Sequence, residues 1–117
     1  MFLGLRTTIY QVNDLQRATG WYTKLIGHEP YFNQPFYVGF SVGSYELGLI
    51  PDGDGATTYW GTTEIEAEFA RAIALGATAH SAIKDVGEGI RVASVKDPFG
   101  NIVGLIENPH FKSEHAG

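Results

Sequence analysis

Few side chains in this sequence carry the chemistry of a catalyst or of a metal ligand. There is no cysteine, which excludes thiolate zinc sites, iron–sulfur clusters, disulfide scaffolds and cysteine nucleophiles. The four histidines are spread along the chain: His28 after an expected helix, His80 inside an expected strand, and His110 and His115 in a polar C-terminal segment. We favour an ordinary, exposed histidine at all four positions and keep His80 as a candidate for a binding cleft.

Composition and charge exclude several classes of protein. The 117 residues include only 8 Lys and Arg and carry a net charge of −5, so we expect no nucleic-acid partner. No apolar run is long enough to span a membrane, and the first residues lack the pattern of a signal peptide, so we expect a cytoplasmic protein with no membrane partner. No GxSxG, P-loop or GxGxxG motif occurs, and the GDG at Gly53–Gly55 is typical of a turn.

The first half of the chain predicts a strand, a helix and then short strands. The helix, over Leu15–Ile26, has apolar residues at helical spacing, Asn13 or Asp14 as N-cap and Gly27 as C-cap. β-Branched and aromatic residues predict the strands. These are Leu3–Val12, an extended His28–Phe32 followed by an Asn33–Pro35 turn, and Phe36–Val42 and Tyr45–Ile50 around a Gly43-Ser44 hairpin turn.

After a turn-rich linker at residues 51–56, the same order of elements begins again. The second set is a strand at Thr57–Thr63, a helix at Ile65–Leu75, and strands at Ala77–Ile83, Ile90–Val95 and Ile102–Ile106. The repeat is also visible in the residues, because Tyr45–Pro51 aligns with Asn101–Glu107 and brings Gly48 onto Gly104. An internal duplication is stronger evidence for a fold than the propensity of any single segment.

The duplication predicts a single α+β domain over residues 1–117, made of two tandem βαβββ modules. The modules cover about residues 3–50 and 57–107, and a polar tail follows at residues 108–117. Each module alone would leave one face of its sheet uncovered. We therefore expect the modules to form a curved mixed sheet around a cleft, with the helices on the outer face.

Three segments of the chain resemble the vicinal-oxygen-chelate superfamily, which is also called the glyoxalase, bleomycin-resistance and extradiol-dioxygenase superfamily. They are Val12–Gly27, Phe69–Ala77 and the DPFGN motif within Lys96–Asn101, and their order and spacing fit across roughly residues 3–108. The resemblance implies the fold. It leaves the function open, because the superfamily includes lyases, isomerases, dioxygenases, epimerases and drug-binding proteins.

The resemblance also implies a divalent metal, held by His or Glu side chains on the first and last strands of each module. Transferred residue by residue, the ligand positions fall on Thr7, Gly48, Thr57 and Gly104. None of these residues is a usual metal ligand. We therefore expect no metal and no other cofactor, while a metal bound through displaced ligands such as Glu46 and His80 stays open.

Strand alternation identifies the residues that share the cleft-facing side with these four positions. They are mainly apolar, with a few polar groups to orient a ligand, and they are our ligand-binding candidates: Ile9, Gln11, Glu46, Ile50, Tyr59 and Ile106. Trp21 and Trp60 are expected in the core on the helix side. The sequence leaves open which face of the sheet carries Phe36, Tyr37, Phe40 and Arg91. A salt bridge at the surface would account for Arg91.

Two functions are consistent with this pattern. The one we favour is a metal-free protein of the bleomycin-resistance kind that binds a small apolar or aromatic compound; the resemblance implies a homodimer. The alternative is a lyase, isomerase or dioxygenase of the same superfamily, either metal-dependent through displaced ligands or metal-free with Glu46 as general base. Glu46 is thus the one candidate catalytic residue, and a partly solvated carboxylate at the rim of the cleft is its other interpretation.

Overall fold

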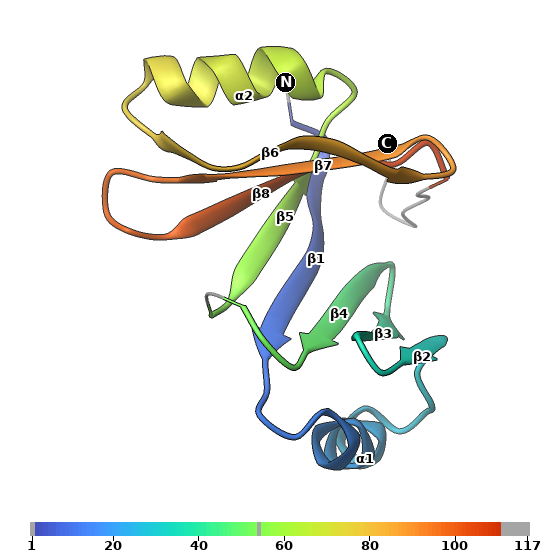
Figure 1. The fold of residues 1–117 in the computed structure, drawn as a ribbon. Coiled ribbons are helices and arrows are strands. Elements are labelled where there is room, and N and C mark those ends of the chain that lie inside the picture. Colours follow the sequence, from blue (N-terminus) through green and yellow to red (C-terminus); the bar gives the residue numbers. More distant parts are fainter. Residues whose placement is uncertain (1, 54, 111–117) are drawn as a thin grey trace. The chain divides into compact units, whose positions relative to one another are not determined.

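The order of elements is βαβββ, repeated once. The structure is a computed structural model that describes residues 2–53 and 55–110. The first run is β1 (Gly4–Gln11), α1 (Leu15–Ile26), β2 (Phe32–Gln34), β3 (Tyr37–Val42) and β4 (Tyr45–Ile50). The second is β5 (Thr57–Gly61), α2 (Ile65–Ala74), β6 (Thr78–Gly87), β7 (Ile90–Lys96) and β8 (Ile102–Glu107) (Figure 1). The α+β class is confirmed, and the elements follow the order that the repeat predicts.

Contacts divide the chain into two units. The α1 unit is Thr7–Ala56, and the α2 unit combines the described residues up to Arg6 with those from Thr57 on. The strand order is β2-β3-β4-β1 in the α1 unit and β5-β8-β7-β6 in the α2 unit. In each unit one pair is parallel, β1 with β4 and β5 with β8, and the other neighbours are antiparallel. The two units therefore share one topology.

Helix α1 covers one face of the sheet in its own unit. Asp14 caps it by accepting a hydrogen bond from the Arg17 N–H at 3.0 Å, and Gly27 ends it with φ 97°. The buried side chains beneath the helix are Val38, Phe40 and Leu49. Because side chains alternate along a strand, the other face of this sheet carries the intervening residues of β3 and β4.

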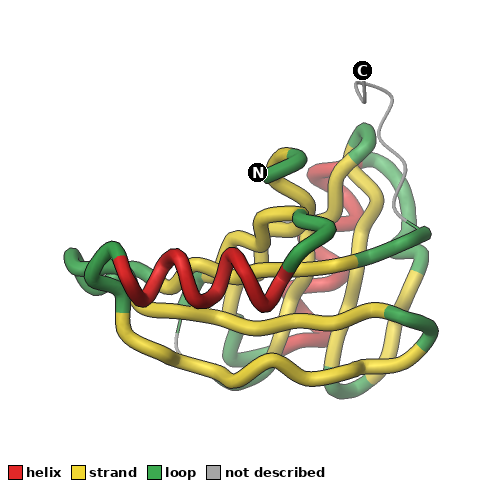
Figure 2. Tube along the Cα trace, turned by 90° about the horizontal axis from the view of Figure 1, so that it is seen from above, coloured by secondary structure: helices red, strands yellow, loops and turns green. Residues whose placement is uncertain are grey.

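Helix α2 lies in the same way over the sheet of its own unit (Figures 1 and 2). Its first residue, Ile65, is fully buried and packs with Ala93 and Leu105. The Ile65 N–H donates to Glu107 Oε2 at 2.6 Å, and Arg91 donates to Glu107 Oε1 at 2.9 Å. Arg91 also pairs with Glu66 and thereby lowers the pKa of that carboxyl. The expected salt bridge of Arg91 is thus present and ties the start of α2 to β7 and β8.

The turn expected at Asn33–Pro35 is wrong. Asn33 and Gln34 belong to β2, where they pair with Val38 and Tyr37, and the chain turns at Pro35 and Phe36 instead. A proline has no N–H to donate to a ladder and a fixed φ that suits the first central position of a turn. The turn therefore begins at the proline, and the two polar residues before it form the edge strand.

The placement of Trp21 in the core is also wrong. Trp21 is 58% exposed and packs edge-on against Tyr22, with ring centroids 4.9 Å apart. The next residue in a helix lies about 100° further round, so the face of α1 that partly buries Tyr22 turns Trp21 outward. Trp60 does contact Phe2 on the α2 side of its sheet, but it is 37% exposed and lies at the edge of the core.

The ends of the predicted modules are only partly described. Asp54 of the linker and residues 111–117 of the tail, His115 included, lie outside the described residues. Within the described tail, the His110 ring makes a 2.9 Å hydrogen bond with the Glu88 carbonyl. In the part of the chain that the structure covers, neither helix is long and apolar enough to cross a membrane.

The DPFGN motif is a turn built around Asp97. Asp97 Oδ1 accepts the N–H groups of Phe99 and Asn101 at 2.8 Å each, and Oδ2 accepts the Asn101 side-chain amide at 3.0 Å. These bonds, that of the Asn101 N–H first, lower the pKa of Asp97 below its ordinary value of 3.8. The motif therefore forms the turn that connects β7 to β8.

We predict that Asp97→Asn destabilises the fold at neutral pH and that the difference from the wild type shrinks in acid. A carboxyl whose pKa is lower in the folded state contributes stability above its ordinary pKa and loses it as the pH falls through the folded value. Urea unfolding between about pH 7 and about pH 2 measures this. Asp52→Asn, at an exposed position in the linker, is the control; equal losses for both variants at all pH values would contradict the prediction.

Candidate functional site

In the α1 unit, the sheet face away from α1 carries four of the six predicted ligand-binding residues. The parallel register of β1 and β4 pairs Thr7 with Glu46, Ile9 with Gly48, and Gln11 with Ile50. Paired residues point to the same side of a sheet. The predicted residues on these strands, Ile9, Gln11, Glu46 and Ile50, therefore share one surface.

Two glycines lie side by side in the middle of this surface. Gly39 of β3 pairs with Gly48 of β4, and both are buried under aromatic side chains. A Cβ on Gly48 would lie 2.8 Å from Cζ of Tyr37, and one on Gly39 would lie 3.1 Å from Cε1 of Tyr31. The distance at Gly48 is shorter than real Cβ atoms show, and the one at Gly39 is tighter than most real contacts. A Cβ on Gly39 would also lie 2.6 Å from Oε2 of Glu46. The tyrosines and Glu46 therefore occupy space that a side chain at these two positions would need.

Glu46 is held between two hydroxyl groups on the same surface. Thr7 donates to Glu46 Oε1 at 2.9 Å, and the Tyr31 hydroxyl donates to Oε2. Partial burial of the phenol, followed by the hydrogen bond to Glu46 and its charge, raises the pKa of Tyr31 well above its usual range, so the hydroxyl keeps its proton. Among the described residues, no ion pair includes Glu46. We call this surface the tyrosine face: Thr7, Ile9, Gln11, Tyr31, Tyr37, Glu46 and Ile50.

The α2 unit has the same arrangement of glycine and tyrosine on its corresponding strands. Tyr59 of β5 pairs with Gly104 of β8, and a Cβ on Gly104 would lie 2.8 Å from Cγ of the Tyr59 ring. Burial raises the pKa of Tyr59. Ser94 of β7 pairs with Gly104 and is buried. Its Oγ lies 2.8 Å from Nδ1 of His80. His80 thus has a local partner in its own sheet.

The residues at the four family ligand positions do not fit a divalent metal. Thr7 uses its hydroxyl on Glu46, Thr57 offers only a neutral hydroxyl, and the glycines offer no side chain and lie beneath Tyr37 and Tyr59. Across residues 2–53 and 55–110, no group of three or more His, Asp or Glu side chains is placed to hold a metal ion.

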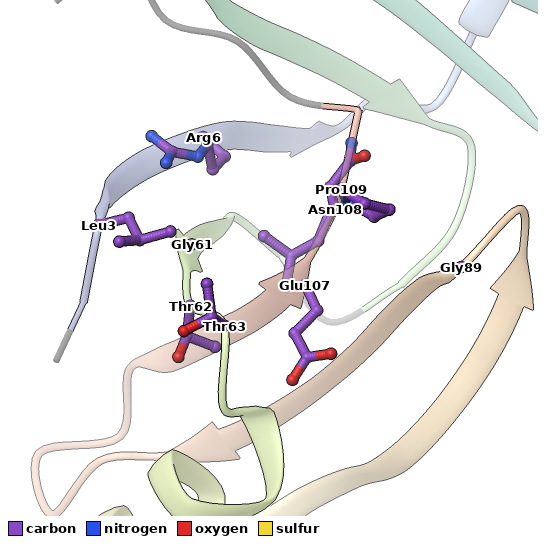
Figure 3. Close-up of a pocket in the computed structure, with 10 residues that line it drawn as sticks. Leu3, Arg6, Gly61, Thr62, Thr63, Gly89, Glu107, Asn108 and Pro109 are labelled. Carbon is purple, nitrogen blue, oxygen red and sulfur yellow. The ribbon is translucent and has the colours of Figure 1, made fainter. Parts of the chain in front are cut away.

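Ile106, the sixth predicted residue, lines a pocket of about 280 Å³ in the α2 unit. Figure 3 labels the other residues that line it. Leu3 and Arg6 form one side, and Asn108 and Pro109 form the other. The remaining wall comes from the ends of β5 and β8 and the residues that follow them, Gly61, Thr62, Thr63 and Glu107, together with Gly89.

The sequence did not show on which face of the sheet Tyr37 lies. It also did not identify Tyr31 or Arg6 as candidate site residues. The glycine pair could have been found, because a hairpin with Gly43-Ser44 at its turn pairs residues 39 and 48 by counting outward from Val42 and Tyr45. The structure also locates the other two aromatic residues whose sheet face the sequence left undetermined. Phe40 lies in the core, and Phe36 is 66% exposed in the turn before β3. No local signal shows that Arg6 lies over Gly61, since these residues are far apart in the sequence.

We predict that Gly104→Ala destabilises the protein by about 1–3 kcal/mol, because the new methyl group overlaps the base of the Tyr59 ring. Gly20→Ala is the matched control, since nothing lies within 4 Å of a Cβ there and alanine favours the interior of α1; it should stabilise by about 0.5–1 kcal/mol. Urea unfolding measures both. If Gly104→Ala cost as much in a Tyr59→Ala background, the ring would not be the cause.

Several solved structures resemble this chain in fold. A glyoxalase/bleomycin resistance protein/dioxygenase superfamily member from Vibrio splendidus 12B01 has a TM-score of 0.70 at 17% identity, over 89% of this chain and 99% of the other. A methylmalonyl-CoA epimerase variant from Streptomyces coelicolor, in complex with 2-nitronate-propionyl-CoA, reaches 0.78 at 15% identity, over 97% and 99%. A hypothetical protein from Bacillus halodurans C-125 reaches 0.76 at 12% identity, over 94% and 97%.

No family model and no curated protein sequence matches the chain. Identities of 12–17% over nearly the whole length establish a common architecture and carry no activity with them. They agree with the element order, with the two units of one topology, and with the three sequence segments that resemble the superfamily. The chain has the fold of the vicinal-oxygen-chelate superfamily, to which glyoxalase, bleomycin-resistance and dioxygenase proteins belong.

Proposed function

We propose that this protein binds a small apolar or aromatic molecule, without a metal ion, on the tyrosine face. One observation carries the proposal: where the superfamily resemblance places metal ligands, this chain has glycines that lie beneath tyrosine rings. The glycines remove the chemistry of a Lewis-acid site and give the rings a place against the backbone. In the α2 unit, Tyr59 and Ile106 are the corresponding proposed ligand contacts.

The composition of the tyrosine face suits such a ligand. The rings of Tyr31 and Tyr37, with Ile9 and Ile50, offer apolar area, and Tyr31 is 64% exposed. Stacking on an aromatic ring contributes about 0.5–1.5 kcal/mol beyond the area that it buries. A carboxylate accepts up to about four hydrogen bonds, and Thr7 and Tyr31 provide two, so Glu46 can accept a donor from the ligand and orient it.

We predict that aromatic compounds with a hydrogen-bond donor bind, and that Glu46→Gln weakens them about tenfold, which corresponds to about 1.4 kcal/mol for a bond to a charged acceptor. Tyr31→Ala should weaken the same compounds through lost ring contact. A fluorescence-quenching screen followed by calorimetry measures the affinities. Glu29→Gln, an equal change of charge at an exposed position, is the control. If neither Glu46→Gln nor Tyr31→Ala changed the affinity of any compound that binds, the proposed contacts would be wrong.

We further predict that protein purified without chelators contains no stoichiometric metal. Titration with Ni²⁺, Zn²⁺ or Mn²⁺ should give only weak, non-saturating binding, because threonine hydroxyls and glycines supply no ligand set for these ions. Elemental analysis and calorimetry measure both quantities. A tight site with one ion per chain would contradict the metal-free proposal and would favour the alternative with displaced ligands.

A second candidate function rests on the contact between Glu46 and Tyr31. A carboxylate next to a protonated phenol can remove a proton from a bound molecule while the phenol stabilises the charge that develops. A lyase, isomerase or dioxygenase of this fold with Glu46 as general base is therefore our alternative. Deuterium exchange into the compounds that bind separates the two functions, because a base exchanges an acidic C–H and Glu46→Gln stops the exchange.

Homodimerisation and a cytoplasmic location remain proposals from the resemblance and the composition. Sedimentation of the purified chain tests the first, and fractionation of cells tests the second.

A further inference from the structure

The two helices of the repeat carry side chains of different size at equivalent positions. Tyr22 follows the first residue of α1, Leu15, by two helical turns and packs against the core of its unit. The residue at the same distance from Ile65, the first residue of α2, is Ala72. A methyl group is much smaller than a tyrosine side chain, so the second half of α2 does not fill the space that Tyr22 takes up beneath α1.

A pocket of about 240 Å³ lies at this part of the α2 unit, and we call it the α2 pocket. Two small residues, Ala72 and Ala77, line it, and its larger apolar side chains come from β5, β7, β8 and the residues near the ends of α2 and of the chain: Phe2, Trp60, Leu75, Val95, Val103 and Leu105. Val95 and Leu105 are 1% exposed, whereas Trp60 is 37% and Leu75 is 71% exposed. Apolar area therefore continues from the buried sheet out to solvent.

Backbone contacts hold two walls of the α2 pocket in place. At the end of α2, the Ala77 N–H donates to the Ala72 carbonyl at 3.0 Å, and Gly76 between them has φ 109°. The opposite wall is Pro98, in the turn that is built around Asp97. A Cβ on Gly76 would lie 3.6 Å from Cγ of Pro98, which is ordinary contact. A pocket with fixed walls costs a ligand little ordering energy.

The polar side chains at the α2 pocket already have partners within the chain. Glu68 is 4% exposed and pairs with Arg71, whose Nε lies 2.8 Å from Glu68 Oε1. Asp97 accepts the N–H groups of Phe99 and Asn101, which favour its charged form. A ligand thus meets mainly apolar contacts next to a carboxylate, an environment that is unfavourable for a second anion.

We propose that the α2 pocket binds a compact neutral molecule, a single aromatic ring with at most a few further carbon atoms and no charged group. An apolar cavity of about 150 Å³ in a protein can hold benzene, so a pocket of about 240 Å³ has room for such a ring. The ring lies over Val95 and Val103, next to Trp60. The site lies on the helix side of its sheet and is independent of the tyrosine face and of the function proposed there.

Titration of the full chain, labelled with ¹³C at its methyl groups, with toluene and with benzoate tests the proposal. Toluene should shift the methyl signals of Val95, Val103 and Leu75 and saturate them. Benzoate should bind at least about tenfold more weakly, because its carboxylate loses water beside Asp97. In a Trp21→Phe background, toluene should also move the emission of Trp60 to shorter wavelength, because it displaces water from that ring.

Ala72→Leu should weaken toluene at least about tenfold without loss of stability, because the larger side chain fills the pocket. Ala74→Leu, the same change at an exposed position of α2, is the matched control and should leave the affinity unchanged. The methyl spectrum of each variant also reports whether it folds. Equal affinity for benzoate, unchanged binding by Ala72→Leu, shifts confined to methyl groups of the α1 unit such as those of Val38 and Leu49, or no saturable shift would each overturn the proposal.

Discussion

The structure depends on glycines that face away from the helix in the middle of each sheet. Gly48 and Gly104 lie at equivalent positions of β4 and β8, and each leaves a flat strip of backbone that a tyrosine ring covers. A methyl group at either position would overlap the ring, so the missing side chain is what allows the aromatic surface to form. The same constraint acts at Gly61, where the covering side chain is Arg6.

The two surfaces that contain these glycines carry different side chains. On the tyrosine face, rings and a carboxylate lie together, and Glu46 accepts hydrogen bonds from Thr7 and Tyr31. In the pocket of the α2 unit that Ile106 lines, Glu107 accepts the Ile65 N–H and Arg91, and Thr62 accepts the Glu64 N–H. A carboxylate that keeps spare lone pairs can accept further hydrogen bonds. The two surfaces therefore differ in their polar groups although they are built on one repeated topology.

The sequence predicted the elements and their faces well because both follow from local patterns. Helix α1 and strand β4 have the predicted bounds, since apolar spacing, caps and turn residues are all local to them. Alternation correctly placed Ile9, Glu46 and Ile50 on one face, because a strand has a period of two whatever surrounds it. It was wrong at Asn33–Pro35, where pairing with β3 decides the strand, and at Trp21, where one step of helical rotation decides burial.

By itself, then, the sequence determined the α+β class and the repeated βαβββ order, and it aligned Gly48 with Gly104. Only the tertiary structure decided which side chains cover the glycines: Tyr37 over Gly48, Tyr59 over Gly104 and, at a further position, Arg6 over Gly61. It also decided that Glu107 accepts hydrogen bonds from Arg91 and from the start of α2. The physical reason is that a missing side chain is visible in a sequence, whereas its replacement comes from a neighbouring strand whose register and rotamers are fixed only when the sheet is assembled.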